Sequence, residues 1–311
     1  MIRITLSIII IFFFISCKKD GKMPPINNAI DLDGNIINDS SLVYPDHFLL
    51  SASKSSPSNT DKTKPVIIAV HGFSATTFEW IEFRDFARLN NSFQTSVILL
   101  GGHGRDYDDF KSASWENWQA PIIEEYNKLR QLGYNNISFI GSSTGCPLIL
   151  EAIYSGRINN DVLKNIFFID PIVVPSNKLL SLVSIVGPIL SYSESSMAQG
   201  ENGFWYKYRP YQALDQLNEL TQSVRKKLEK GITLPNNVKM KVFKTEKDDA
   251  ADPISAVLLQ KGIKLANGNS IGLQMIPSNL HVFTRLKGRS YITNTDVQIQ
   301  SSVFNEIKNS L

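Results

Sequence analysis

Short apolar runs alternate with segments of helical periodicity along most of the chain. The apolar runs, bounded by turn residues, predict strands near residues 66–70, 96–100, 137–140, 165–169, 239–244 and 271–276. A clear helix is predicted between Ser114 and Gly133, because Trp115, Trp118, Ile122, Tyr126, Leu129 and Leu132 recur three or four positions apart. Alternating β and α elements predict an α/β fold, with a mostly parallel central sheet covered by helices on both faces.

A glycine-flanked serine follows one of these predicted strands. Ser143 is the centre of the segment Gly-Ser-Ser-Thr-Gly at 141–145, between the apolar run 136–140 and an apolar segment at 146–154 that is long enough for a helix. A sharp turn from strand to helix holds a serine hydroxyl out of the sheet, and the flanking glycines let neighbouring backbone pass close to it. The motif arises often by chance, but this strand–turn–helix context predicts a nucleophilic serine.

The candidate base follows from the order of residues. Of the four histidines, His47, His71, His103 and His281, only His281 lies after Ser143. In the order serine, acid, histidine the base comes last, so His281 is the candidate general base. The alternative is a solvated loop histidine.

Several aspartates compete for the role of the acid that orients the histidine. Asp248 is nearest the expected end of the strand 239–244, and it is the first choice. Asp249 is the reserve, and the choice between these two stays open. Asp252, beside a proline, is expected to start a helix at Ile254, and Asp170 after the strand 165–169 is a remoter candidate. The carboxylate would hold the imidazole in one tautomer and stabilise the imidazolium.

Over roughly residues 64 to 311 the chain resembles α/β-hydrolases of the bacterial carboxylesterase and monoacylglycerol lipase type, which are also grouped with serine aminopeptidase-like hydrolases. The resemblance implies an α/β-hydrolase fold, Asp248 as the acid, His281 as the base and a structural role for His71. Thr245 departs from the glycine usual in the family, and Ser142 occupies a spacer that is often histidine. The segments that carry the resemblance are His-Gly-Phe at 71–73, Gly-Gly-His-Gly at 101–104, the serine motif, Glu-Lys-Asp at 246–248, Asp-Pro at 252–253 and His-Val at 281–282.

Two backbone N–H groups are candidates for an oxyanion hole. Acyl transfer builds negative charge on the carbonyl oxygen, and fixed N–H donors stabilise that charge without reorganising. The donors expected are those of Thr144, directly after Ser143, and of Phe73, in the loop after the first apolar strand. The segment 101–104 fits either a flexible turn or a position at the rim of the substrate site.

The amino terminus has a different character from the rest of the chain. Arg3 precedes an almost wholly apolar stretch at 4–15, which suits a signal peptide and is too short to span a membrane. Cys17, directly after Ser16, resembles the lipidated cysteine of a bacterial lipobox; an uncleaved signal anchor is the alternative. We therefore expect a lipoprotein signal peptide at 1–16, a tether at 17–40, and a lipid-anchored protein of the bacterial cell envelope.

The remainder, 41–311, is expected to form one hydrolase domain. An opening strand region is predicted at 42–50, a turn at 51–64, and a cap over the site at about 172–235, since that interval is too long for a simple connection. A helix with Leu214, Leu217, Leu220 (or Thr221), Val224 and Leu228 on one face is predicted inside it. Apolar and aromatic residues of the cap would line an acyl pocket or pack the cap onto the body.

Composition narrows the function without naming the substrate. The net charge is +3, and removal of Arg3 with the signal peptide leaves 31 basic against 29 acidic residues, or +2, so a nucleic-acid partner is not expected. Metal-ligand spacing and phosphate loops are absent from the sequence, so neither a metal nor another cofactor is expected. Cys146 is expected to be a buried free thiol.

These observations predict a serine hydrolase that cleaves a small-molecule or monoacylglycerol-like ester through an acyl-enzyme. A peptidase or amidase using the same three residues is the alternative enzyme. A non-catalytic, lipid-tethered binding module is the alternative from another class.

Overall fold

The computed structural model describes residues 57–158, 161–177, 187, 190–201 and 203–311. The expected signal peptide, the tether with Cys17, and the opening strand at 42–50 lie outside these residues. Among the described residues, none of the helices is both long and apolar enough to cross a membrane.

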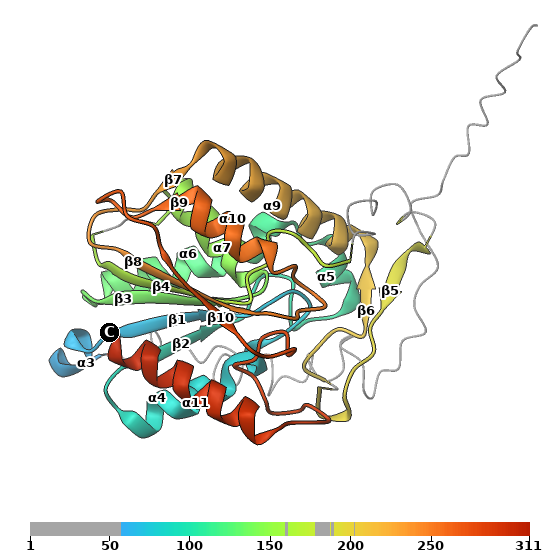
Figure 1. Cartoon of the computed structure of the whole chain (residues 1–311), viewed down its shortest axis with the longest axis horizontal. Coiled ribbons are helices and arrows are strands. Elements are labelled where there is room, and N and C mark those ends of the chain that lie inside the picture. Colours follow the sequence, from blue (N-terminus) through green and yellow to red (C-terminus); the bar gives the residue numbers. More distant parts are fainter. Residues whose placement is uncertain (1–56, 159–160, 178–186, 188–189, 202) are drawn as a thin grey trace, which may run out of the picture.

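A six-stranded parallel sheet forms the centre of the molecule (Figure 1). All six predicted strands are present, with the second and fourth beginning two residues earlier than predicted. The order β10-β8-β4-β3-β1-β2 places the early strands at one side and the late strands at the other. The strands are β1 (Val66–Val70), β2 (Gln94–Ile98), β3 (Ile137–Ser142), β4 (Leu163–Ile169), β8 (Lys239–Thr245) and β10 (Gly272–Ile276).

Helices cover both faces of the sheet, as predicted. Alternate residues of β1 belong to two different hydrophobic cores. Ile68 packs with a first group of helices on one face of the sheet, and Ile67 packs with a second group on the other face. Both are fully buried, which is why the strands of this parallel sheet read as continuous apolar runs. The first group is α6 (Trp115–Gln131), α7 (Gly145–Tyr154), α9 (Tyr211–Lys230) and α10 (Ile254–Gly262), and the second is α4 (Ile81–Asn90) and α11 (Asn294–Asn309) (Figure 1).

The helix predicted from the aromatic periodicity is α6. Ser114 is its N-cap and forms a capping box with Asn117, which satisfies backbone donors at the start of the helix. Its buried face includes Trp118, Ile122 and Tyr126, as the spacing predicts.

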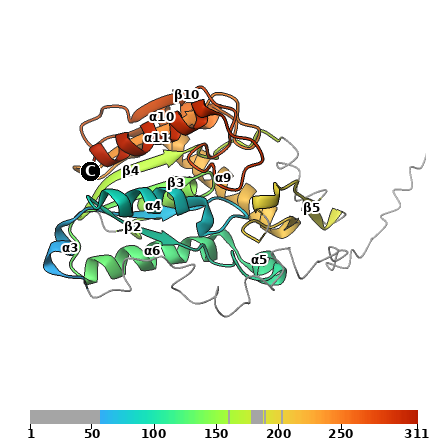
Figure 2. The same ribbon diagram turned by 90° about the horizontal axis from the view of Figure 1, so that it is seen from below.

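The insertion after β4 has two structural parts. The first contains a two-stranded antiparallel hairpin, β5 (Tyr192–Glu194) and β6 (Tyr208–Pro210), with the 3-10 helix η4 (Gln199–Glu201) between them. Figures 1 and 2 both place β5 at the end of the sheet remote from the C-terminus. The second part is α9, which is the predicted helix and packs against α7 and α10. The expected cap at 172–235 therefore includes a helix that belongs to the body of the domain.

The interval 51–64 differs from its prediction where it is described. Instead of a turn, it contains the short helix α3 (Asn59–Thr63), because Ser58 and Asp61 form a capping box that satisfies the first backbone donors.

The remaining elements are the 3-10 helix η2 (Thr77–Trp80), α5 (Tyr107–Ser112), and the short parallel pair β7 (Ile232–Thr233) and β9 (Ile263–Lys264).

Candidate active site

Ser143 occupies a strained turn at the carboxyl end of β3. Its φ of 47° lies in the left-handed region, which residues other than glycine adopt at an energetic cost. The turn leads directly into α7, and the serine is 6% exposed. A Cβ at Gly145 would lie 2.5 Å from the carbonyl oxygen of Val70, so the tight packing of this turn against β1 requires a glycine there.

Asp248 and His281 are joined by a hydrogen bond. Nδ1 of His281 lies 2.8 Å from Oδ2 of Asp248. The other carboxylate oxygen of Asp248 accepts the backbone N–H groups of Ala250 and Ala251, at 2.8 and 3.0 Å. Asp249 is exposed. Of the two aspartates that the sequence left open, Asp248 is therefore the one in contact with the histidine.

A fully buried lysine lies between two aspartates in this site. Nζ of Lys244 contacts Oδ2 of Asp248 and lies 3.3 Å from Oδ1 of Asp170, and all three side chains are inaccessible to solvent. Thr245, the departure from the family pattern, donates to Asp170 from both its N–H (2.8 Å) and its hydroxyl (2.9 Å). Lys244 was not among the residues predicted from the sequence. The available signal was its position in the strand, four residues before Asp248.

The electrostatic surroundings keep Asp248 ionised. Burial acts to raise the pKa of its carboxyl, but the hydrogen bond and charge of His281 and the ion pair with Lys244 together hold this pKa well below its usual value. Potential ligand atoms of Asp170, Asp248 and His281 also lie within 4.8 Å of one another, as in a metal site. The ammonium of Lys244 already contacts both carboxylates and supplies the positive charge there.

The loop that carries His281 is held by hydrogen bonds from Arg289. The guanidinium of Arg289 donates to the carbonyl oxygens of His281 and of Val282, the latter at 3.2 Å. Val282 has a φ of 52°, an unusual conformation for a β-branched residue. Strain next to the histidine and strain at Ser143 thus occur at the same end of the sheet.

Ser143 and His281 line one pocket of about 490 Å³ at the carboxyl ends of the strands. Phe73 and Thr144 line it too, and among the described residues neither of their backbone N–H groups has a hydrogen-bond acceptor. Thr144 is also the N-cap of α7, so the positive end of the helix dipole points to this position. The two predicted oxyanion donors therefore lie beside Ser143 with their N–H groups available.

A buried glutamate fixes the segment 71–73 to the serine turn. Oε1 of Glu79 accepts the N–H of Gly72 at 2.7 Å and also contacts the hydroxyl of Ser142. A Cβ at Gly72 would lie 3.0 Å from the Cβ of Ser143, so the two segments meet closely. Glu79 was not predicted from the sequence, because it lies in η2 outside any recognised motif.

The two histidines near the first strands, His71 and His103, are buried and make structural contacts. In His71, Nδ1 lies 2.8 Å from the carbonyl oxygen of Gly72 and Nε2 accepts the N–H of Leu100, and burial lowers the pKa of the ring to about 4. His103 is also fully buried, and its ring packs against those of Phe110 and Trp118. The segment 101–104 therefore contains a turn, one of the two alternatives, and His103 within it is part of an aromatic core.

Cys146, the second residue of α7, is a buried free thiol, as expected. Its Sγ lies 3.2 Å from the carbonyl oxygen of Gly141, and burial raises the pKa of the thiol.

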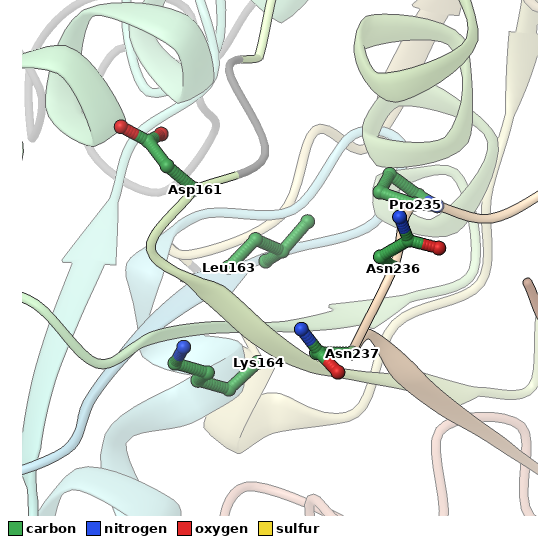
Figure 3. A pocket seen from close by; sticks show the side chains of 6 residues that line it. All are labelled: Asp161, Leu163, Lys164, Pro235, Asn236 and Asn237. Atoms are coloured by element: carbon green, nitrogen blue, oxygen red, sulfur yellow. The ribbon is translucent and has the colours of Figure 1, made fainter.

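A second hollow, of about 450 Å³, lies near the amino ends of β4 and β8 (Figure 3). Its described lining contains neither a serine nor a histidine, so it offers no nucleophile and base for the predicted chemistry. The lining residues are Asp161, Leu163, Lys164, Pro235, Asn236 and Asn237.

Comparisons with known proteins point to lipases and esterases. No family model matches the chain. A thermostable monoacylglycerol lipase from Bacillus sp. (strain H-257) is 24% identical over 228 residues, which cover 70% of this chain and 83% of that lipase.

Solved structures show the same fold at lower identity. One of the metagenome-derived lipolytic enzymes LipS and LipT has a TM-score of 0.63 at 15% identity, covering 79% of this chain and 94% of that one. A soluble variant of monoglyceride lipase from Saccharomyces cerevisiae, solved with a substrate analogue, has a TM-score of 0.63 at 11% identity, covering 82% and 87%. The chain therefore has the α/β-hydrolase fold and is similar to lipases and esterases of that fold.

Proposed function

We propose that the chain is a serine hydrolase that cleaves carboxylic esters, with Ser143 as nucleophile, His281 as general base and Asp248 as the acid that orients His281. The observation that carries the proposal is the 2.8 Å contact between Asp248 and His281 in a pocket that Ser143 also lines. The lipases and esterases to which the chain is similar support the same class of reaction.

The hydrogen bond between Asp248 and His281 determines which nitrogen of His281 acts as the base. Because Nδ1 of His281 is held by Asp248, Nε2 is the nitrogen that takes the proton from Ser143 Oγ as this oxygen attacks the ester carbonyl carbon. The N–H groups of Phe73 and Thr144 stabilise the negative charge that develops on the carbonyl oxygen.

The reaction then proceeds in two half-reactions, acylation of Ser143 and hydrolysis of the acyl-enzyme, and each ends with breakdown of a tetrahedral intermediate. The imidazolium of His281 returns its proton to the departing alcohol, which leaves Ser143 acylated. Water then gives a proton to His281 and attacks the acyl carbon, and the proton passes to Ser143 as the carboxylic acid leaves.

The pocket suits a small-molecule or monoacylglycerol-like ester. Its volume of about 490 Å³ lies within the range of sites for small ligands. Ile172, Leu214 and Leu217 line it and would hold an acyl chain away from water. These residues come from the segment predicted as the cap.

Labelling with a fluorophosphonate probe tests the proposal. The wild-type protein should be labelled, whereas the Ser143→Ala variant should be unlabelled and lose about a millionfold in kcat. Unlabelled wild-type protein would favour the non-catalytic binding module, and equal labelling of both proteins would place the nucleophile elsewhere.

A substrate panel separates the ester hydrolase from the peptidase or amidase. The three proposed catalytic residues serve both, since they do not encode the leaving group. We expect turnover of p-nitrophenyl esters of graded chain length, and little turnover of aminoacyl amides. The reverse preference would assign the chain to the amidase class while leaving the roles of the three residues intact.

We also propose that Cys17 is lipidated and anchors the enzyme to a membrane of a bacterial cell envelope. The support is the short apolar segment at 4–15 followed by Ser16 and Cys17.

A further inference from the structure

The candidate pocket contains a cation that the proposed reaction does not use. Arg209, in the middle of β6, lines the pocket together with Ser143 and His281. Its buried Nε has no hydrogen-bond acceptor among the described residues. A guanidinium carries five N–H donors and stays charged, so buried donors without an acceptor are costly unless a ligand satisfies them.

The described carboxylates that act on Arg209 or line the same pocket form no ion pair with it. The negative charge of Glu201 acts to raise the pKa of Arg209, but that carboxylate is paired with Arg285. Glu79, in the same pocket, accepts from Gly72 and Ser142 instead. Asp249 also lines the pocket but is exposed, and within the described part of the chain it forms no ion pair with Arg209. Within the described part of the chain, the positive charge of Arg209 is thus left for a group that enters the pocket.

The position of Arg209 is fixed by the fold. It lies opposite Ser193 in the β5–β6 hairpin, and its neighbours Tyr208 and Pro210 are buried. The preceding segment is tied to the body by Tyr206, whose N–H donates to Ser74 and whose hydroxyl lies 2.7 Å from the carbonyl oxygen of Arg105. A charged group on such a support is pre-organised, and it needs little rearrangement to bind a ligand.

We infer that Arg209 is a specificity-determining residue and that the natural substrate is an ester carrying a second, anionic group, a carboxylate or a phosphate, which the guanidinium binds. Planar guanidinium groups match the oxygens of both anions in two parallel hydrogen bonds. The inference rests on the proposed esterase function and narrows its substrate class from carboxylic esters in general to esters that also carry an anion.

Burial supports this assignment from a second direction. Burial lowers the pKa of Arg209, against the opposing effect of Glu201, and the Nε atom itself is buried in a side chain that is otherwise half-buried. An anion that replaces the missing solvation is bound more strongly there than at an exposed arginine.

Two matched pairs of esters test the inference. On the acyl side, mono-4-nitrophenyl adipate is compared with 4-nitrophenyl hexanoate; on the alcohol side, 1-butyrylglycerol 3-phosphate is compared with 1-butyrylglycerol. Wild-type kcat/KM should be at least about tenfold higher for the charged member of one pair, since a charged hydrogen bond is worth about that factor or more. The pair that responds identifies the side of the ester that carries the anion.

Variants of Arg209 then locate the effect. Arg209→Gln should lower kcat/KM for the preferred charged ester by roughly ten- to a hundredfold, while the neutral ester of the same pair changes by less than about twofold. Arg209→Lys should restore part of the preference. Lys207→Gln is the matched control, because it removes one positive charge from the adjoining segment but does not line the pocket, and it should leave the preference unchanged.

The outcomes separate this inference from the function on which it rests. No hydrolysis of any ester by the wild-type protein would overturn the esterase proposal itself. Hydrolysis of the neutral esters without preference for either charged partner, or a preference that Arg209→Gln leaves intact, would overturn the role of Arg209 alone. Equal losses on charged and neutral esters would also overturn it, because Arg209 would then support the pocket rather than bind an anion.

Discussion

At the scale of single residues, two adjacent aspartates have opposite surroundings, and this gives a sharp prediction. Asp248→Asn should keep the fold but lower kcat by about four orders of magnitude, because the amide favours the wrong tautomer of His281. Asp249→Asn, at an exposed position, should keep most activity on a neutral ester. Steady-state kinetics on one p-nitrophenyl ester would measure both. An inactive Asp249→Asn variant beside an active Asp248→Asn variant would contradict the proposed acid.

Lys244 gives a prediction in pH dependence. The pKa of the Asp248 carboxyl is held low in the folded protein, so the stability it contributes is present above its unfolded pKa of about 3.8 and is lost as pH falls through the folded value. Lys244→Met removes one of the causes that lower this pKa. Loss of this positive charge favours protonation of the hydrogen-bonded pair Asp248 and His281 as a unit, so the acid limb of the kcat/KM profile and the acid unfolding transition should both move to higher pH.

A lysine three positions earlier provides the control for this experiment. Lys241 lies on the same strand and pairs with Glu306 away from the site. Lys241→Met should leave the acid limb in place. If Lys244→Met does not fold, the double variant Lys244→Met/Asp170→Asn removes both members of one buried ion pair and should show the same displacement. An unchanged acid limb in a folded variant would show that Lys244 has no influence on Asp248.

The sequence singled out Ser143 and His281 as candidates but not Lys244 or Arg209, for a physical reason. Ser143 is marked by a local turn that requires glycines, and His281 by its order in the chain. Lys244 and Arg209 are functional candidates only because of what lies near them in space. In the sequence Lys244 reads as an ordinary polar position in a strand, and one of its two partners, Asp170, lies 74 residues away. Arg209 belongs to a segment for which no strand was predicted, and its unpaired Nε is visible only in the structure.

At the scale of elements, the serine turn depends on the small residue that begins α7. Gly145→Ala should destabilise the fold by about 1–3 kcal/mol, because the added Cβ meets the backbone of β1. It should also lower kcat by about a hundredfold, since Ser143 would be displaced by on the order of 1 Å. Thermal unfolding and ester kinetics measure the two effects separately.

Gly268→Ala is the comparison for this variant. At that position the φ is 83° and no atom lies within 4 Å of the added Cβ, so only backbone strain of about 1–2 kcal/mol is expected. Its kcat should stay unchanged. A normal kcat for Gly145→Ala would mean that the turn adjusts without moving the nucleophile.

The buried strands were predictable, whereas the insertion was only partly so. Strands covered on both faces need continuous apolar runs, and this signal is strong in β1 and β4. The helix α9 was found from its apolar stripe, but its packing on α7 and α10 was not, because periodicity shows that a face is buried and does not show against what. The hairpin of β5 and β6 has only three residues per strand, too few to show an alternation.

At the scale of the whole molecule, the proposed anchor and the catalytic domain are separable. Cys17→Ser should block lipid attachment, which radiolabelled palmitate would measure in a bacterial host. Two or more acyl chains hold a protein stably on a bilayer, since each buried methylene contributes about 0.8 kcal/mol. Absence of label on the wild-type protein would contradict the anchor and leave the hydrolase proposal untouched.

A chain beginning at Gly21 is the matching control. All the proposed catalytic residues lie within the described domain, so this shortened protein should be soluble and fully active on a small water-soluble ester. Loss of activity on shortening would show that residues before the described domain contribute to the site.

The buried thiol next to the serine turn can serve as a probe of local opening in the shortened protein. Cys146 would be its single cysteine, and it is protected by burial and by its contact with the carbonyl of Gly141. A disulfide reagent such as dithionitrobenzoate should therefore react only when α7 separates from the sheet, so the reaction rate reports how often the nucleophile's support opens. A phosphonate bound covalently at Ser143 should slow that reaction, which would make a cysteine outside the proposed chemistry a reporter of occupancy at the serine.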